Sequence, residues 1–297
     1  MDLSNAHFQH PVKPLEALVS PPVSNPRAMA WSGEELLVVD NEGTVHLVEP
    51  SYGARKLFRA APNPVRIAIS PSSTAGRRVA ILDAAGLLRV YGLDGRLWWE
   101  RLTGLIAGLQ VTFEASGLVA VGDAGDARRA LALDPDGGVL SRARVPARTV
   151  AVPQPTGLPW LVRSLSTGLQ VLPWGVPLGS EAGTQHHLYV APNCVFGVSS
   201  GGVTLWRGPR PKEHGVAQEA VTVKLLDVAN AAVSLDGETL ALATRSGGVS
   251  VTVARPGVVR PGSGGVTAHE APVTGLGFSQ RGRWLASLAE RVWIWSY

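Results

Sequence analysis

The chain has 297 residues, of which 45% are hydrophobic and 17% charged, and its formal net charge is +4. This composition excludes an intrinsically disordered chain and supplies enough apolar side chains for a sizeable core. The 34 glycines and 22 prolines exclude an all-helical bundle, because both residues interrupt helices. No stretch approaches about 18 consecutive apolar residues, so we expect no membrane span and no membrane partner.

The first segment, residues 1–25, is expected to be an extended arm, because prolines recur along it and disfavour a helix. It lacks the basic stretch followed by a continuous apolar stretch that a secretory signal requires. The single cysteine, Cys194, leaves no internal disulfide and is expected to lie in an apolar core. We therefore predict a cytoplasmic protein with an N-terminal arm over residues 1–25 and one domain over residues 26–297.

From residue 29 onward, the chain repeats a unit of short apolar strands separated by tight turns. The copies begin about 41 residues apart on average, which matches the 40–45 residues of a four-stranded propeller blade. The sequence therefore predicts an all-β fold, a seven-bladed β-propeller of four-stranded antiparallel blades, with six or eight blades left open. In chain order, the copies occupy residues 29–49, 64–102, 108–145, 149–174, 187–206, 227–254 and 269–297.

The predicted strands are nearly continuous apolar runs, as at residues 36–40, 79–83 and 240–244. Such runs are typical of strands that are buried on both faces, which is the situation of blades stacked around a channel. The Ala-rich segment 216–233 leaves a short helix open as an exception to the all-β pattern.

The last copy carries the most distinctive residues. His269 precedes the strand sequence PVTGLGFS at residues 272–279, Ser287 lies on the second strand and Trp295 near the end of the third. On these residues the copy resembles a WD40 repeat, and the chain resembles a divergent, bacterial WD40-type propeller. The resemblance implies that His269, Ser287 and Trp295 form a hydrogen-bonded network that stabilises the blade. The WD dipeptide is absent, and the acidic turn of the family is shortened to Ala289–Glu290.

The same resemblance predicts how the ring closes. The final copy ends after its third strand, which leaves blade seven one strand short. In WD40 proteins an N-terminal strand commonly supplies the missing outer strand, so a segment within residues 12–19 is the expected donor. Such closure removes two exposed sheet edges at once.

The sequence gives no indication of a catalytic, metal or cofactor site. The segment Gly197–Gly201 matches the Gly-x-Ser-x-Gly pattern of hydrolases, but an apolar strand follows it where that chemistry needs a helix. The seven histidines never fall at metal-ligand spacing with each other or with a cysteine pair. We therefore predict no catalytic residue, no metal and no cofactor.

Charged turns and one aromatic pair are the candidate partner-binding residues. Aspartates recur at the turns between the second and third strands of blades one to three, where WD40 proteins use them to stabilise turns, and arginines occupy these turns in blades six and seven. Strand alternation sends the two neighbouring tryptophan rings to opposite faces. Packing of both rings between blades is the favoured interpretation, and exposure of one ring for binding is the alternative. The candidates are Asp40, Asp83, Asp123, Arg245, Arg291, Trp98 and Trp99.

The WD40 resemblance implies a non-enzymatic protein-interaction scaffold, which is our favoured hypothesis. We expect it to be a monomer by itself and to bind one or more proteins of unknown identity. Two alternatives stay open: an enzyme or small-molecule binder with a site in the central channel, and a nucleic-acid-binding module. The nucleic-acid alternative rests on arginine, which supplies 23 of the 27 cations but is scattered along the chain.

Overall fold

A computed structural model describes the chain from residue 16 to residue 296, with gaps. For residues 150–227 it describes the strands and their pairing. All regular secondary structure in the described part is β-strand, which confirms the predicted all-β fold. The residues in this range that are not described are 20, 51, 71–75, 115–116, 126, 147–148, 153–159, 166–167, 173–175, 180–186, 192–193, 200–201, 208–219, 224–227, 235–238 and 254–265.

The described strands pair into seven four-stranded antiparallel sheets, which we number as blades in chain order. Blade one contains β2 (Pro26–Ser32), β3 (Glu35–Asp40), β4 (Thr44–Glu49) and β5 (Gly53–Arg59). Blade two contains β6 (Pro64–Ile69), β7 (Arg78–Asp83), β8 (Leu87–Gly92) and β9 (Leu97–Leu102). Blade three contains β10 (Ala107–Glu114), β11 (Gly117–Ala124), β12 (Ala127–Leu133) and β13 (Val139–Val145).

The remaining blades follow the same plan. Blade four contains β14 (Thr149–Val152), β15 (Trp160–Leu165), β16 (Gly168–Leu172) and β17 (Val176–Gly179). Blade five contains β18 (His187–Ala191), β19 (Cys194–Ser199), β20 (Gly202–Arg207) and β21 (Ala220–Val223). Blade six contains β22 (Val228–Val233), β23 (Thr239–Thr244), β24 (Gly248–Val253) and β25 (Val266–Thr267). Blade seven contains β26 (Gly275–Phe278), β27 (Trp284–Leu288), β28 (Val292–Ser296) and the N-terminal β1 (Glu16–Val19).

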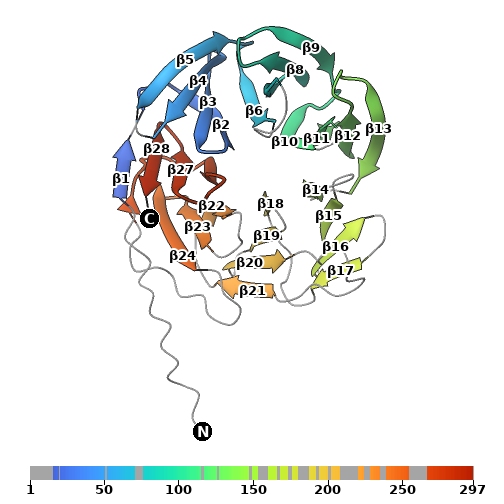
Figure 1. Ribbon diagram of the computed structural model, residues 1–297. Helices are drawn as coiled ribbons and strands as arrows, with labels where there is room; N and C mark the ends of the chain where they lie inside the picture. Colours follow the sequence, from blue (N-terminus) through green and yellow to red (C-terminus); the bar gives the residue numbers. More distant parts are fainter. Residues whose placement is uncertain are drawn as a thin grey trace.

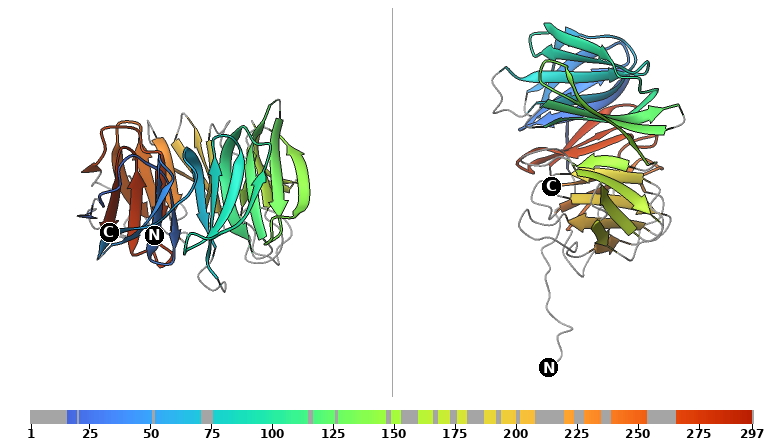
Figure 2. Two further views of the ribbon diagram at one scale, coloured as in Figure 1. Left: turned by 90° about the horizontal axis from the view of Figure 1, so that it is seen from above. Right: turned by 90° about the vertical axis from the view of Figure 1, so that its right-hand side faces the viewer.

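The blades are arranged around a central axis, as Figure 1 shows. In blades one to six the strands follow chain order from the inside outwards, so the first strand of each blade lies nearest the axis. Successive inner strands contact each other from β14 through β18, β22 and β26 to β2, β6 and β10, and β11 contacts β14. In the side views of Figure 2 the strands run across the thickness of this ring. The architecture is therefore that of a β-propeller.

Blade seven is completed by the N-terminal segment. Strand β1 pairs antiparallel with β28, with Glu16 opposite Ser296 and Ala17 opposite Trp295. The prediction that a segment within residues 12–19 closes the ring is confirmed for residues 16–19, and residues 12–15 lie outside the described part. The strand order of this blade is β1-β28-β27-β26, so segments from both ends of the sequence share one sheet.

The core lies between the blades, which explains the continuous apolar runs of the sequence. In β3, Leu36 and Val38 pack against blade seven, whereas Leu37 and Val39 pack against blade two. None of the four has any exposed surface. Burial of a side chain of this size contributes about 1.5–3 kcal/mol, and here both faces of the strand contribute.

The helix considered for the Ala-rich segment 216–233 is wrong where the structure describes it. Residues 220–223 form β21 and residues 228–233 form β22. Ala231 and Ala232 are buried on β22, the inner strand of its blade, where small side chains suit the converging sheets. Packing in the ring therefore overrides the local helix preference of alanine.

The hydrolase-like segment also has the structure that excludes a nucleophile elbow. Strand β19 ends at Ser199 and pairs antiparallel with β20, which begins at Gly202. Residues 200–201 between them lie outside the described part. A second strand, and not a helix, follows the serine, as the sequence predicts.

Candidate interaction surfaces

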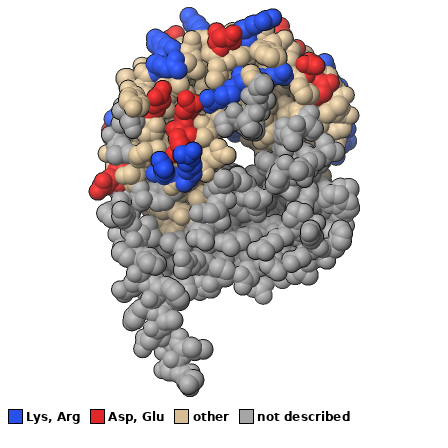
Figure 3. All heavy atoms as spheres, in the orientation of Figure 1, with Lys and Arg blue, Asp and Glu red and all other residues tan. Residues whose placement is uncertain are grey.

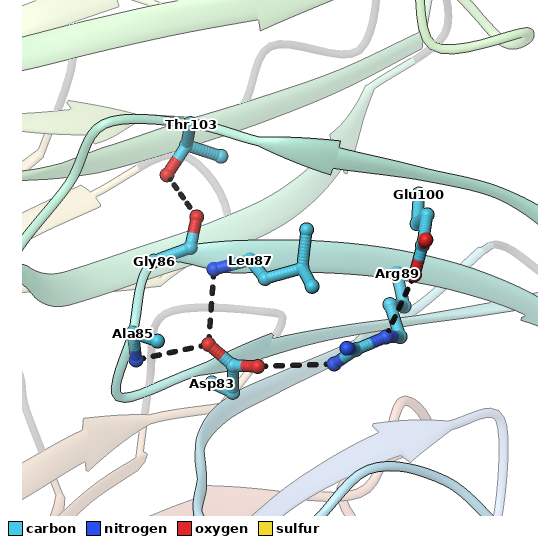
Figure 4. Close-up of polar contacts among 7 residues, drawn as sticks. All are labelled: Asp83, Ala85, Gly86, Leu87, Arg89, Glu100 and Thr103. Carbon is cyan, nitrogen blue, oxygen red and sulfur yellow. Dashed lines mark hydrogen bonds and ion pairs between the residues drawn. The ribbon is translucent and has the colours of Figure 1, made fainter.

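Two of the predicted turn aspartates bind the backbone of their own turns. In blade two, Oδ1 of Asp83 accepts hydrogen bonds from the backbone N–H groups of Ala85 and Leu87, both at 2.9 Å (Figure 4). In blade one, Oδ1 of Asp40 accepts the two equivalent hydrogen bonds, from the backbone N–H groups two and four residues further along the chain, at 3.0 and 2.8 Å. Each carboxylate thus satisfies two backbone donors, which stabilises the hairpin between the second and third strands.

The other carboxylate oxygen of each aspartate contacts a cationic or imidazole side chain on the next strand. Oδ2 of Asp83 lies 3.0 Å from Nη1 of Arg89, whose Nε donates to Glu100 at 3.0 Å (Figure 4). Oδ2 of Asp40 lies 3.2 Å from Nε2 of His46, which is buried. The charge of these turns is therefore engaged within the blade.

Asp123 in blade three is paired in a similar way. Its Oδ1 accepts a hydrogen bond of 2.9 Å from Nε of Arg128. Burial would raise the pKa of Asp40, but the hydrogen bonds from His46 and Thr44 outweigh it and hold that pKa below its ordinary value. On the face seen in Figure 3, positive and negative side chains lie next to one another over the described part. The three aspartates are thus in the predicted turns, and their contacts favour turn stabilisation over partner binding.

In the turn that follows Asp83 in blade two, a glycine fixes the turn to the connection that enters blade three. Gly86 has φ of +80° and its carbonyl oxygen accepts hydrogen bonds from the backbone N–H and the hydroxyl of Thr103, at 2.9 and 2.6 Å (Figure 4). A Cβ atom at Gly86 would lie 2.0 Å from the carbonyl oxygen of Leu105. The left-handed backbone and the close approach both require glycine. We call the end of the ring that carries these turns and connections the upper face.

The two predicted arginines lie at the equivalent turns of blades six and seven. Arg245 is exposed in the turn between β23 and β24, where Oγ1 of Thr244 takes the role of the aspartate and accepts from the N–H of Gly248 at 2.9 Å. Arg291 is half exposed, with its Nε 3.5 Å from Oε1 of Glu290. The structure thus places both arginines on the upper face of neighbouring blades.

The structure brings together the three residues of the predicted network in blade seven. The hydroxyl of Ser287 lies 2.8 Å from Nε2 of His269 and accepts a hydrogen bond of 3.0 Å from Nε1 of Trp295. All three side chains are buried. A fourth residue completes the set, because Nδ1 of His269 lies 3.3 Å from Oε1 of Glu290. From the sequence the turn at Ala289–Glu290 was expected to be shortened, and this contact of Glu290 was not predicted.

The network has one consistent arrangement of protons. Burial lowers the pKa of His269 below its ordinary value, although the nearby charge of Glu290 acts in the opposite direction. Burial would raise the pKa of Glu290, but backbone hydrogen bonds and His269 outweigh it and lower that pKa. A neutral His269 can donate from Nδ1 to the carboxylate and accept at Nε2 from the hydroxyl of Ser287, which accepts from Trp295. Each polar group of the network is then satisfied.

The two adjacent tryptophans have different environments. Nε1 of Trp99 donates to the carbonyl oxygen of Pro135 in blade three at 2.9 Å, and its ring packs on the core between blades two and three. The side chain of Trp98 is 46% exposed, and the guanidinium carbon of Arg78 lies 3.9 Å from its ring centroid. The interpretation that both rings pack between blades is therefore wrong for Trp98, because alternation along β9 turns its ring away from the face that blade three covers and nearly half of it stays exposed.

A group of exposed apolar residues was not predicted from the sequence. Among the described residues, the exposed large apolar side chains other than Tyr52 lie on β9, on β13 or on the connection that follows β9. Their exposed fractions range from 37% to 68%. The sequence signal is a strand that mixes charged with apolar residues, unlike the continuous runs of the inner strands. We call the five of them that lie on the outermost strands β9 and β13 the outer wall: Leu97, Trp98, Leu102, Val139 and Leu140.

Searches for two kinds of site give no candidate among the residues that the structure describes. No group of three or more His, Cys, Asp or Glu side chains in this part of the chain has an arrangement that could hold a metal ion. In the same part, no helix is long and apolar enough to cross a membrane.

Comparison with known proteins identifies the fold through structure. No protein-family model and no curated protein matches the sequence. The β-propeller domain of Cps50 (Swd1) from Myceliophteria thermophila is similar in structure, with a TM-score of 0.72 and 14% identity over 96% of this chain and 100% of that one. Raptor from Chaetomium thermophilum is similar with a TM-score of 0.70 and 11% identity, over 95% of this chain and 29% of that one. At these identities the similarity shows the fold alone, a β-propeller, as the repeats predict.

Proposed function

We propose that this propeller is a non-catalytic scaffold that binds other proteins in the cytoplasm and is a monomer by itself. The observation that carries the proposal is the outer wall. Monomeric proteins rarely expose large apolar side chains in groups, and such groups commonly mark sites of protein interaction. The similarity to solved propeller domains supports the scaffold architecture.

Trp98 is the strongest single candidate on this wall. Exposed tryptophan is enriched among the residues that dominate binding energy at interfaces. The guanidinium of Arg78 lies over the Trp98 ring and also donates to the carbonyl oxygen of Pro135 in blade three, so the exposed ring rests on a side chain that is itself fixed before any partner arrives. A side chain held in this way loses little conformational entropy on binding.

Hydrogen bonds between blades one and seven make the ring rigid where it closes. Blade one is attached to blade seven by the indole of Trp31, which donates to the carbonyl oxygen of Gly277 at 2.8 Å. Glu34 adds hydrogen bonds from the hydroxyl of Ser279 and the backbone N–H of Arg281, at 3.1 and 2.9 Å. These hydrogen bonds fix the position of blade one relative to blade seven, and a rigid seam of this kind suits a scaffold.

The test is copurification with chemical cross-linking and mass spectrometry, using the tagged full chain in a lysate of the organism that encodes it. We expect the native chain to retain one or more proteins, and we expect Trp98→Ala or Leu140→Ser to lower the retained amount at least fivefold. Tyr52→Ser is the matched control, because Tyr52 is 87% exposed on blade one and should retain the same proteins. The proposal fails if the chain retains no protein above a tag-only control. It also fails if the chain retains nucleic acid in place of protein, or retains a small molecule that it converts into a product.

A further inference from the structure

Strand β13 presents an open sheet edge next to the outer wall. It is the last strand in the order β10-β11-β12-β13, and no described strand pairs with its outer side. Its pairing with β12 is regular from Ser141 to Val145, and Ser141, Arg142 and Arg144 are exposed. An edge of this kind carries backbone N–H and C=O groups that can pair with an added strand.

The side chains of this edge have one sign of charge. Arg129 on β12 lies directly opposite Arg144 on β13, and Arg142 is two residues away on the same face. Neither β12 nor β13 contains an aspartate or glutamate. Among the ion pairs between described residues, none involves Arg129 or Arg142. An acidic side chain placed next to Arg129 or Arg142 would therefore meet positive charge along this edge.

The equivalent outer strand of blade one differs in this respect. Arg55 and Arg59 on β5 are exposed as well, but each lies near a glutamate of its own blade, Glu49 at 4.0 Å and Glu42 at 3.5 Å. The edge of blade three thus combines exposed arginines with the adjacent apolar Val139 and Leu140. Charged side chains alone are enough to protect a sheet edge from unwanted pairing, so protection would require only the arginines. A binding edge uses the arginines and the apolar side chains together.

We propose that the edge of blade three binds an extended segment of a partner protein, rich in Asp or Glu alternating with apolar residues, which adds to β13 as a fifth strand. The proposal rests on the scaffold function proposed above and names the chemistry of its partner. Backbone hydrogen bonds to residues 141–145 would supply affinity that does not depend on side chains. The acidic side chains would contact Arg129 and Arg142, and the apolar ones Val139 and Leu140.

The experiment measures binding to the full chain by fluorescence anisotropy with two labelled peptides and one oligonucleotide. The peptides are five Glu–Val repeats and five Lys–Val repeats, and the oligonucleotide is a 20-mer of thymidine. We expect the Glu–Val peptide to bind at least tenfold more tightly than the Lys–Val peptide and than the oligonucleotide. Its dissociation constant should rise severalfold between about 50 and 300 mM salt, because the contacts are charged.

Variants and hydrogen exchange locate the site. Arg142→Glu and Arg129→Glu should each weaken Glu–Val binding at least fivefold, and the milder Arg142→Gln at least twofold. Arg55→Glu on blade one is the matched control and should leave binding within twofold. Amide exchange of residues 141–145 should slow on binding, whereas contact through side chains alone would leave it unchanged.

Four outcomes overturn the proposal: equal affinity for the two peptides, indifference to both arginine substitutions, tighter binding of the thymidine 20-mer than of the Glu–Val peptide, or unchanged amide exchange of residues 141–145 on binding. These outcomes differ from failure of the scaffold function. If the native chain and Arg142→Glu copurify with the same proteins, the scaffold function stands and the acidic-strand proposal fails. If the native chain retains no protein at all, the scaffold function itself fails.

Discussion

Replacing Ser287 by alanine tests the hydrogen-bonded network of blade seven most directly. The hydroxyl of Ser287 accepts from Trp295 and lies within hydrogen-bond distance of His269, at 3.0 and 2.8 Å. The exposed fractions of Ser287, His269 and Trp295 are 0%, 2% and 1%, so water cannot replace the lost hydroxyl without a local opening. Ser287→Ala therefore leaves two buried polar atoms unpaired while removing only one oxygen.

The expected cost follows from those two atoms. A buried polar group that loses its partner costs about 1–3 kcal/mol, so with two such groups the variant should lose about 2–6 kcal/mol of unfolding free energy. For a chain of this size, this corresponds to a fall in melting temperature of about 3–10 °C. The assay is urea denaturation followed by tryptophan fluorescence, with thermal unfolding by circular dichroism as a second measure.

Ser32→Ala is the matched control for this variant. Ser32 is also a buried serine on a strand, at 7% exposure, but its hydroxyl has no hydrogen-bond partner among the described residues. Its removal should change the unfolding free energy by less than about 0.5 kcal/mol or stabilise the protein. If Ser287→Ala costs no more than Ser32→Ala, the network does not stabilise the blade and the reasoning is refuted.

Four other expectations follow from the same structure. Because the pKa of His269 is lowered in the folded state, stability should be greatest above about pH 6.5 and fall as the pH drops below it. The unfolding free energy of His269→Ala should fall less between about pH 7.5 and 5.5 than that of the native chain, and an equal fall would contradict this. Deleting residues 1–25 removes β1 and exposes the edge of β28, so size-exclusion chromatography should show oligomers and the melting temperature should fall; monomeric elution with unchanged melting would oppose it. Asp83→Ala should cost about 1–3 kcal/mol in urea denaturation, because it removes two turn hydrogen bonds and an ion pair, and a change under about 0.5 kcal/mol would assign the turn's stability elsewhere. Charge reversal at Arg245 and Arg291 should slow association with a copurified partner in low salt and leave folding unchanged, whereas unaffected rates would move the binding site away from the upper face.

The fold could be predicted because the propeller repeats its own local signals. Each blade repeats the pattern of apolar runs and turn residues at a similar spacing. The repeat length can therefore be recognised even where one copy has diverged. The missing fourth strand of blade seven also predicted that a segment within residues 12–19 closes the ring, because an incomplete sheet needs a partner; the structure places this strand at residues 16–19. The helix at 216–233 could not be excluded, because alanine favours a helix until the packing around the axis is known.

The candidate surfaces were harder to predict, because exposure depends on contacts between blades. Alternation correctly separated the rings of Trp98 and Trp99, but only the fold reveals that blade three covers Trp99 and leaves Trp98 exposed. Glu290 was missed because a glutamate, with one more methylene than aspartate, reaches the histidine from a shorter turn. The alignment of Arg129 with Arg144 required the register of β12 and β13, which the sequence does not specify.

The pairing of β1 with β28 has a consequence for how the protein is made. Glu16 emerges early from the ribosome and its partner Ser296 emerges near the end, so this sheet cannot form while the intervening blades are being synthesised. Loop closure over so long a segment is slow when it precedes other contacts, but here the blades that fold first shorten the effective distance. A chain stalled before β28 therefore has two unpaired edges at one seam and is a natural substrate for chaperones, whereas a completed chain hides both.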